Sequence, residues 1–386
     1  MMKLLEPTET AVNRSARHRV QQWLIKERFF LLLIGGALLL AYGLFPYPRV
    51  AMWLGFMLAG YSAIANDSIQ TVGTFIASNS HRPWWVLWLY IGGILVVTLV
   101  VSWWLYEGDV SYQRLSTKGF DRAPTRFAFL QIAAPIFLLV LTRLRMPVST
   151  TFLLLSSFST RSDTILDVLT KSLSGYLIAF TVALVAWYGL DRTISHRWPG
   201  RAHPAWEVAQ WLTSGFLWAI WIMQDAANIA IYLPRQLNVG ELLAFVGFLF
   251  VGLGVLFYLR GDTIQRVVDE KSEVTDIRAA TLIDLVYALI LLVFQGISTV
   301  PMSTTWVFIG LLGGREIALS LARRGELRAS GRMARKDIGL AGIGLVVSIL
   351  IAVTVNPLVQ QELRQRWHIL TSSVETPSAS VNFQRL

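Results

Sequence analysis

A cluster of polar side chains follows an apolar stretch early in the sequence. Asn66, Asp67 and Gln70 come directly after the run VAMWLGFMLAGYSAIA. An ionised carboxylate buried in a bilayer costs several kcal/mol, so such an Asp is paired, protonated or bound to a cation. Because no Lys or Arg lies near Asp67 in the sequence, we expect its partner to be an ion from solution. Carboxylate and amide oxygens are hard ligands of the kind that Na⁺ accepts, and a protonatable carboxylate would serve equally for H⁺.

The same pattern returns in a second apolar stretch, WAIWIMQDAANIAIYL. Gln224, Asp225 and Asn228 repeat the first cluster with the two amides exchanged. A single cluster of this kind could serve only to join helices by hydrogen bonds. Two matched clusters favour ion binding, because each copy keeps a carboxylate with an amide one helical turn away.

Two proline-led hydroxyl motifs form a second matched pair. They are MPVSTTF at 146–152 and VPMSTTW at 300–306. The serine two residues after each proline is placed to cap a short helix, whose free backbone N–H groups attract anions. The hydroxyl groups that could surround a tetrahedral oxyanion belong to Ser149, Thr150, Thr151, Ser303, Thr304 and Thr305. The alternative is that these hydroxyls bond back to their own helices.

The elements that must position these residues are membrane helices. Of the 386 residues, 54% are hydrophobic and 15% are charged, and the mean hydropathy is +0.53. One water-soluble core cannot bury that much apolar surface. The apolar runs that approach the length of a membrane crossing are 29–45, 50–66, 84–106, 127–141, 164–190, 206–233, 240–259, 279–294 and 338–355. We therefore predict an all-α integral membrane protein.

Composition also argues against several classes of chemistry. The chain has no cysteine, and its 5 histidines show no metal-ligand spacing. The net charge of +10 comes from basic residues between the apolar runs, where the positive-inside rule explains them without nucleic acid. No His/Glu cluster or acidic metal motif lies outside the runs, which argues against an enzyme. We expect no cofactor, only Na⁺ or H⁺ as a coupling ion.

The spacing of the two motif pairs indicates a duplication. Corresponding residues recur from 67 to 225 and from 149 to 303, which is nearly one period. Each copy contains five elements. If every element crosses the bilayer, this odd number makes the second repeat inverted relative to the first, whereas re-entrant S-T-T elements would remove this argument. With one extra N-terminal helix, we predict about eleven transmembrane or half-membrane helices. The predicted segments are a cytoplasmic segment 1–28, the extra helix 29–49, the repeats 50–190 and 206–358, a connecting loop 191–205 and a tail 359–386.

With both motif pairs in view, the chain resembles the inorganic phosphate transporter (Pit-type) family. That family carries a repeated GANDVAN motif and a repeated P-x-S-T-T-H element. The stretches IANDSIQTVGT and MQDAAN match the first motif, and PVSTT and PMSTT match the second. The residues shared with the first motif are Ala65, Asn66, Asp67, Gly73 and Thr74 in one copy and Asp225, Ala227 and Asn228 in the other.

The resemblance implies secondary active transport of inorganic phosphate, coupled to Na⁺ or H⁺. Phosphate would be held at the midplane by the six S-T-T residues together with Asp67 and Asp225. The coupling ion would be held by Asn66, Asp67, Gln70, Gln224, Asp225 and Asn228, with Na⁺ at the two aspartates. The expected partners are the oxyanion, the cation and the lipid bilayer, and homodimers are common among such transporters. The lack of long inserted loops favours a bacterial plasma (inner) membrane.

The sequence departs from the family pattern at Ile64 for Gly, at Gln70 and Gln224 for Asn, and at Phe152 and Trp306 for the His after S-T-T. A sulfate permease of the same fold is therefore an alternative, as is a non-transporting sensor or scaffold with the same pocket. Hydrogen phosphate carries an O–H that a site carboxylate can accept, whereas sulfate has none. Retention of Asp67 and Asp225 therefore favours phosphate, unless both carboxylates hold cations.

Two further acids lie near apolar runs. Asp167 has Lys171 four positions later, which favours an ion pair on one helix near the membrane interface. Asp284 lies deeper and has no local partner. It is either an acid near the interface or a further site for a coupling ion or a proton.

Overall fold

The computed structural model describes residues 9–144, 148–197, 202–259, 277–322, 327–361 and 364–365. Within these ranges the regular structure is helical throughout, which confirms the predicted all-α class. The α-helices are α1 (Glu9–Leu44), α2 (Pro48–Ser62), α3 (Ser68–Ser78), α4 (Trp84–Leu105), α5 (Phe129–Arg143), α6 (Thr150–Ser156), α7 (Ser162–Arg197), α8 (Ala205–Ala230), α9 (Val239–Tyr258), α11 (Ile277–Ile297), α12 (Thr304–Ala322) and α13 (Leu327–Val355).

Five segments of the described helices are long and apolar enough to cross a membrane. They are Glu27–Leu44, Trp84–Leu105, Ser162–Gly189, Val239–Tyr258 and Ile277–Ile297. Phe129–Arg143 and Gly342–Val355 are shorter apolar helices. Many large hydrophobic side chains on these helices are exposed, as expected for side chains that face lipid. The chain is therefore a multi-pass membrane protein, and its number of helices agrees roughly with the prediction.

The first polar cluster lies on a bent helix. The predicted run 50–66 does not end there: α2 continues through a π-helical turn, Ala63–Asp67, directly into α3. Pro48 starts α2 at a position where its missing N–H costs nothing. The hydroxyl of Ser68 donates to the carbonyl oxygen of Ile64 at 2.6 Å across the widened turn. π turns of this kind are common at functional sites, and Asp67 is the last residue of this one.

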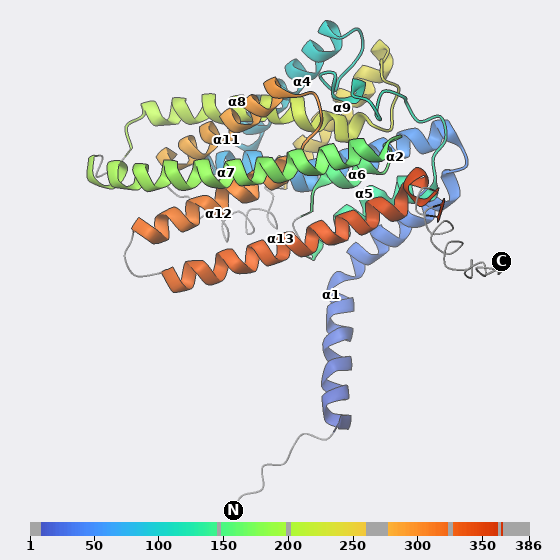
Figure 1. Ribbon diagram of the computed structural model, residues 1–386, viewed down its shortest axis with the longest axis horizontal. Helices are drawn as coiled ribbons and strands as arrows, with labels where there is room; N and C mark the ends of the chain where they lie inside the picture. Colours follow the sequence, from blue (N-terminus) through green and yellow to red (C-terminus); the bar gives the residue numbers. More distant parts are fainter. Residues whose placement is uncertain are drawn as a thin grey trace, which may run out of the picture.

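The helices pack into one interlocked bundle, from which α1 runs out at an angle (Figure 1). The most extensive helix pairs are α7 with α12, α8 with α11 and α4 with α9. The first and third pairs each join a helix from the first half of the chain to one from the second. Helices from the two halves of the chain are therefore interleaved in one bundle, and the halves do not form separate domains.

The α7 and α12 helices approach each other at backbone contact. A Cβ atom at Gly310 would overlap the carbonyl oxygen of Tyr176, and one at Gly314 would overlap the carbonyl oxygen of Phe180. Small residues four positions apart allow such contact between membrane helices. This close pairing holds the start of α12, where the second S-T-T motif lies, against α7.

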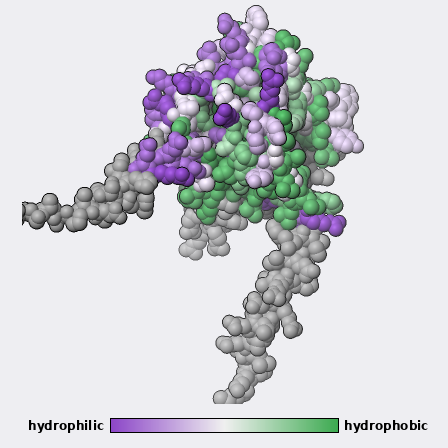
Figure 2. All heavy atoms as spheres, turned by 90° about the vertical axis from the view of Figure 1, so that its right-hand side faces the viewer, coloured by the Kyte–Doolittle hydropathy of each residue, from purple (hydrophilic) through white to green (hydrophobic). Residues whose placement is uncertain are grey.

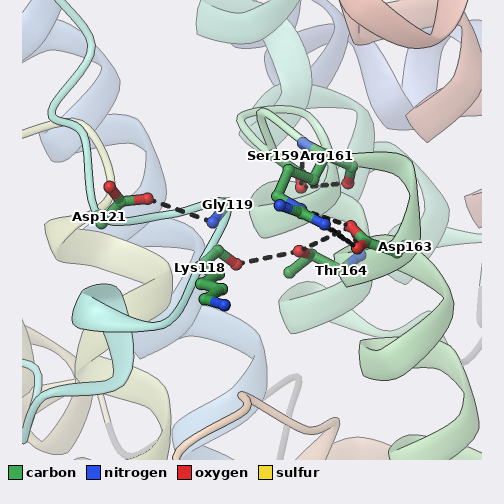
Figure 3. A network of polar contacts seen from close by, with 7 residues as sticks. All are labelled: Lys118, Gly119, Asp121, Ser159, Arg161, Asp163 and Thr164. Carbon is green, nitrogen blue, oxygen red and sulfur yellow. Dashed lines mark hydrogen bonds and ion pairs between the residues drawn. The ribbon is translucent and has the colours of Figure 1, made fainter.

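Loops from both halves meet at one end of the bundle. The backbone N–H of Leu237 donates to the carbonyl oxygen of Gly108 at 2.9 Å, and that of Thr160 donates to Gly119 at 2.9 Å. Figure 3 shows how the loop after α4 is tied to the start of α7, with the Thr164 hydroxyl donating to the carbonyl oxygen of Lys118 at 2.9 Å. The loop between α4 and α5 is thereby fixed over the bundle end.

The surface at this end is polar in part. Figure 2, which views the molecule from the right-hand side of Figure 1, shows hydrophilic residues gathered over one part of the face and a broad hydrophobic area over the rest. Such a division is expected where a polar cap meets the lipid-facing sides of the helices.

The two S-T-T helices differ in length. α6 has only 7 residues, as expected for a short helix, and all of them are buried. α12 has 19 residues, so the expectation of a short second helix was wrong. The reason lies in the sequence that follows each motif: α6 runs into the polar stretch SSFSTRSD, whereas α12 continues into an apolar, glycine-containing run that packs along α7. Pro147 lies outside the described residues, as do residues 1–8 and most of the predicted tail 359–386.

Candidate functional site

The serine of each S-T-T motif caps its own helix, as predicted. The Ser149 Oγ accepts a hydrogen bond from the backbone N–H of Phe152 at 2.9 Å, and the Ser303 Oγ accepts one from Trp306 at 3.2 Å. Both serines are buried. The two helix starts are therefore fixed in the interior of the bundle, where the hydroxyls of Thr151 and Thr304 face α8.

Asp225 is the centre of the polar cluster. Its Oδ2 accepts a hydrogen bond from the Thr304 hydroxyl at 2.7 Å, and its Oδ1 accepts one from Thr151 at 3.4 Å and one from the Asn228 amide. The Asn228 amide also donates to the Thr151 hydroxyl oxygen at 3.0 Å. One carboxylate thus joins the S-T-T motifs of both halves of the chain.

Asp67 lies in the same cluster. Its Oδ1 accepts a hydrogen bond from the Asn66 amide at 2.9 Å, and it is close enough to Asp225 for their charges to interact. The Thr150 hydroxyl lies beside Asp67 but completes no hydrogen bond with it. Both carboxyl groups are 1% exposed, so the structure brings two acids together away from water.

Four polar atoms of the predicted site residues are buried without a hydrogen-bond partner in the described part of the chain. They are Asp67 Oδ2, Thr150 Oγ1, Gln224 Oε1 and Asn228 Oδ1. Buried polar atoms are nearly always paired, with protein groups or with a bound species. Three of the four are carboxylate or amide oxygens, which suit a hard monovalent cation.

The remaining predicted residues have different surroundings. The Gln224 amide donates to the carbonyl oxygen of Leu291 at 3.3 Å, which directs this side chain toward α11. Thr305 is buried, at 4% exposure, without the contact to Asp225 that Thr304 makes. Gln70 belongs to α3, but its side chain lies outside the described residues.

Three further residues near this cluster were not assigned to it from the sequence. Tyr287 on α11 is buried close to both aspartates, and its hydroxyl donates to the carbonyl oxygen of Thr304 at 2.9 Å. Arg114 is close enough to Asp225 to interact with its charge, although it lies in the loop between α4 and α5. Lys171 does not pair with Asp167 as expected. Its ammonium group donates to the carbonyl oxygens of Ser298 and Val300.

Asp284 forms a third buried carboxylate in another layer of the bundle. Its Oδ1 accepts a hydrogen bond from the Thr74 hydroxyl at 2.8 Å, and its Oδ2 accepts one from the Ser214 hydroxyl. With 1% exposure it is buried within the bundle. These contacts join α3, α8 and α11, and both carboxylate oxygens are satisfied by the protein.

The cluster around Asp67 and Asp225 offers donors and acceptors for two kinds of charged species. The threonine hydroxyls can donate to an oxyanion, and the carboxylate and amide oxygens can accept a cation. Two buried carboxylates without an ion-paired base would repel each other, so a cation or a proton beside them lowers the free energy of the site.

No protein-family model matches the chain, and no curated protein matches it. A solved structure of the sodium-dependent phosphate transporter has a similar fold, with a TM-score of 0.54 and 17% sequence identity. The match covers 82% of this chain and 99% of that chain. At this identity the comparison establishes a shared fold alone.

Proposed function

We propose that this protein is a secondary active transporter of inorganic phosphate in the plasma membrane, driven by Na⁺ or H⁺. The fold is shared with a sodium-dependent phosphate transporter. The observation that carries the proposal is the meeting of Asp225 with Thr151 and Thr304, one threonine from each S-T-T motif. Residues from both halves of the chain therefore build one site in the interior of a membrane protein.

The coupling cation is assigned to the carboxylates. Asp67 and Asp225 lie close together, buried and surrounded by amide and hydroxyl groups. A cation bound beside a phosphate dianion offsets part of its charge, so each favours binding of the other. The unpartnered oxygens of Asp67, Gln224 and Asn228 support this assignment, because they supply ligands that the protein itself leaves unused.

Substrate and cation would reach the site by alternating access. Both aspartates are 1% exposed, so the conformation seen here is closed to water on both sides. We infer that the two predicted inverted repeats, 50–190 and 206–358, move against each other to open the site to each side in turn. The π-helical turn that ends at Asp67 supports a functional role for this segment, because such turns are frequent at functional sites.

The test is uptake of radiolabelled phosphate and sulfate into proteoliposomes, with the Na⁺ and pH gradients imposed separately. We expect phosphate to accumulate under one of the two gradients. Accumulation of sulfate alone would assign the fold to a sulfate permease. No flux of either anion under any gradient would contradict transport and would favour a sensor or scaffold.

The Asp67→Asn substitution tests the ion role directly. The amide keeps the size of the side chain but removes the charge that attracts the cation, so gradient-driven phosphate accumulation should be lost. Asp167→Asn is the matched control, because Asp167 is an exposed acid on α7. Normal Na⁺- or H⁺-driven accumulation by Asp67→Asn would contradict the assignment.

A further inference from the structure

Arg114 is a buried cation beside the site, although it belongs to a loop. It begins the 3-10 helix Arg114–Ser116 and is only 1% exposed. Its Nε donates to the carbonyl oxygen of Met223 at 3.0 Å, two residues before Asp225. Its Nη1 donates to the carbonyl oxygens of Thr299 and Val300 at 3.5 and 3.4 Å. These carbonyls precede the second S-T-T motif.

Lys171 reaches the same segment from α7. Its Nζ donates to the carbonyl oxygen of Ser298 at 2.9 Å and to that of Val300. It lies close enough to Arg114 for the two positive charges to interact. Two cations from distant parts of the chain thus converge on residues 298–300, at the bundle end where the loops meet.

Neither cation is neutralised by an ion pair within the described residues. The ion pairs Arg82–Glu207, Arg143–Glu27 and Arg161–Asp163 lie elsewhere. Burial lowers the pKa of Arg114 to about 10, and the charge of Asp225 only partly opposes this effect. Arg114 is buried and Lys171 is half-buried, so their mutual repulsion is only partly screened by water, and an anion between them would lower it.

The chemistry of the two groups defines the anion. The guanidinium group of Arg114 has five N–H donors and makes three contacts to carbonyl oxygens. The ammonium group of Lys171 has three N–H donors. Guanidinium and ammonium groups together are the usual binders of phosphate and related oxyanions. Carbonyl oxygens carry no net charge, so they leave both positive charges uncompensated. The two side chains together could therefore bind a dianion.

We propose that Arg114 and Lys171 form an outer binding site for the oxyanion, through which it passes to the cluster around Asp225. The inference rests on the proposed transport function and adds two specificity residues to it. The site selects for negative charge before the anion meets the carboxylates of the inner cluster. Carboxylates alone would repel a dianion, so the pair also explains how an anion approaches two buried acids.

The test compares phosphate uptake by Lys171→Gln and Lys171→Arg in proteoliposomes. Removing one charge-assisted contact should raise the KM for phosphate roughly tenfold with little change in kcat, and Lys171→Arg should restore the wild-type KM. Lys118→Gln is the matched control, because Lys118 is an exposed lysine of the same end loop. Arg114→Gln should raise the KM further, provided that size-exclusion chromatography shows a folded protein.

The outcomes separate this inference from the proposed function. If wild-type protein transports neither phosphate nor sulfate, the proposed function fails. If wild-type protein transports phosphate and Lys171→Gln lowers kcat at an unchanged KM, Lys171 only positions residues 298–300 and the inference is overturned. An equal KM for Lys171→Gln and Lys171→Arg would overturn it as well, whatever the behaviour of Arg114→Gln.

Discussion

The buried polar side chains in this bundle form two groups. In one group every polar atom has a hydrogen-bond partner in the protein, and in the other at least one atom has none. Asp284 belongs to the first group, because hydroxyls of Thr74 and Ser214 occupy both of its oxygens. Asp67 belongs to the second, because its Oδ2 has no partner in the described residues. The first arrangement is suited to joining helices, whereas the second is suited to holding a ligand.

Thr304→Val tests the hydroxyl contact at the centre of the site. The change keeps the shape of the side chain but removes the donor that lies 2.7 Å from Asp225 Oδ2. A hydrogen bond to a charged group contributes about 1.5–3 kcal/mol, so phosphate uptake should fall by roughly tenfold or more. Initial uptake rates in proteoliposomes measure the effect.

Thr281→Val is the control for this substitution. Its hydroxyl is also buried but donates to the carbonyl oxygen of Ile277 on the same helix, at 2.7 Å. Loss of such a local bond leaves the helix intact. Uptake by Thr281→Val should match wild type. An equal loss of uptake in both variants would show that removing any buried hydroxyl lowers uptake, whether or not it contacts Asp225.

The sequence predicted the polar cluster because its members repeat in two matched motifs. Arg114 could not be found in this way, since it reaches Met223 across a sequence separation of 109 residues. Lys171 was misread because the spacing to Asp167 is right for an ion pair within one helix. Carbonyl oxygens of Ser298 and Val300, which only the fold brings near, hold the ammonium group instead.

At the scale of elements, the α7–α12 pair fixes where the second S-T-T motif begins. Apolar length predicted α7 as a membrane element, whereas α12 was predicted only from its proline-led motif and was taken to be a short helix. The signal that could have corrected this is Gly310 and Gly314, four positions apart in GLLGG. Such spacing is typical of helices in close contact within a membrane.

Gly314→Ala should weaken this pair. The added methyl group would overlap the backbone carbonyl oxygen of Phe180, which cannot move without shifting α7. We expect a loss of about 1–3 kcal/mol in stability, measured as a lower midpoint of thermal unfolding in detergent. Gly313→Ala is the control, because its methyl group would meet only the Phe180 ring at an ordinary distance of 3.6 Å. Equal midpoints for the two variants would show that backbone contact does not limit the pair.

At the scale of the whole molecule, the two halves share their packing and their site. Helix pairs such as α4–α9 cross between the halves, and the end loops are joined by bonds such as that from Leu237 to Gly108. Duplicated motifs predicted two repeats but not how deeply they interlock, because packing between distant helices leaves no periodic signal in the sequence. Alternating access therefore requires these contacts at the bundle end to break and re-form.

A disulfide across the bundle end tests that requirement. The hydroxyls of Thr117 and Thr299, on loops from the two halves, lie 3.3 Å apart, so these two positions are in side-chain contact across the bundle end. The natural chain has no cysteine, so Thr117→Cys with Thr299→Cys introduces a single pair. Oxidation should stop phosphate uptake and reduction should restore it. Full uptake by the oxidised protein would show that this end stays closed throughout the cycle.

The enclosure of Asp67 and Asp225 also has a kinetic meaning. An ion held by these carboxylates has no path to water in this conformation, since each residue is 1% exposed. Its residence time is then set by how often the surrounding helices separate, on the microsecond-to-second scale of such motions, and not by the strength of its own bonds. Ions that bind tightly and ions that bind weakly would then leave at similar rates. Which ion occupies the site is therefore decided before the site closes.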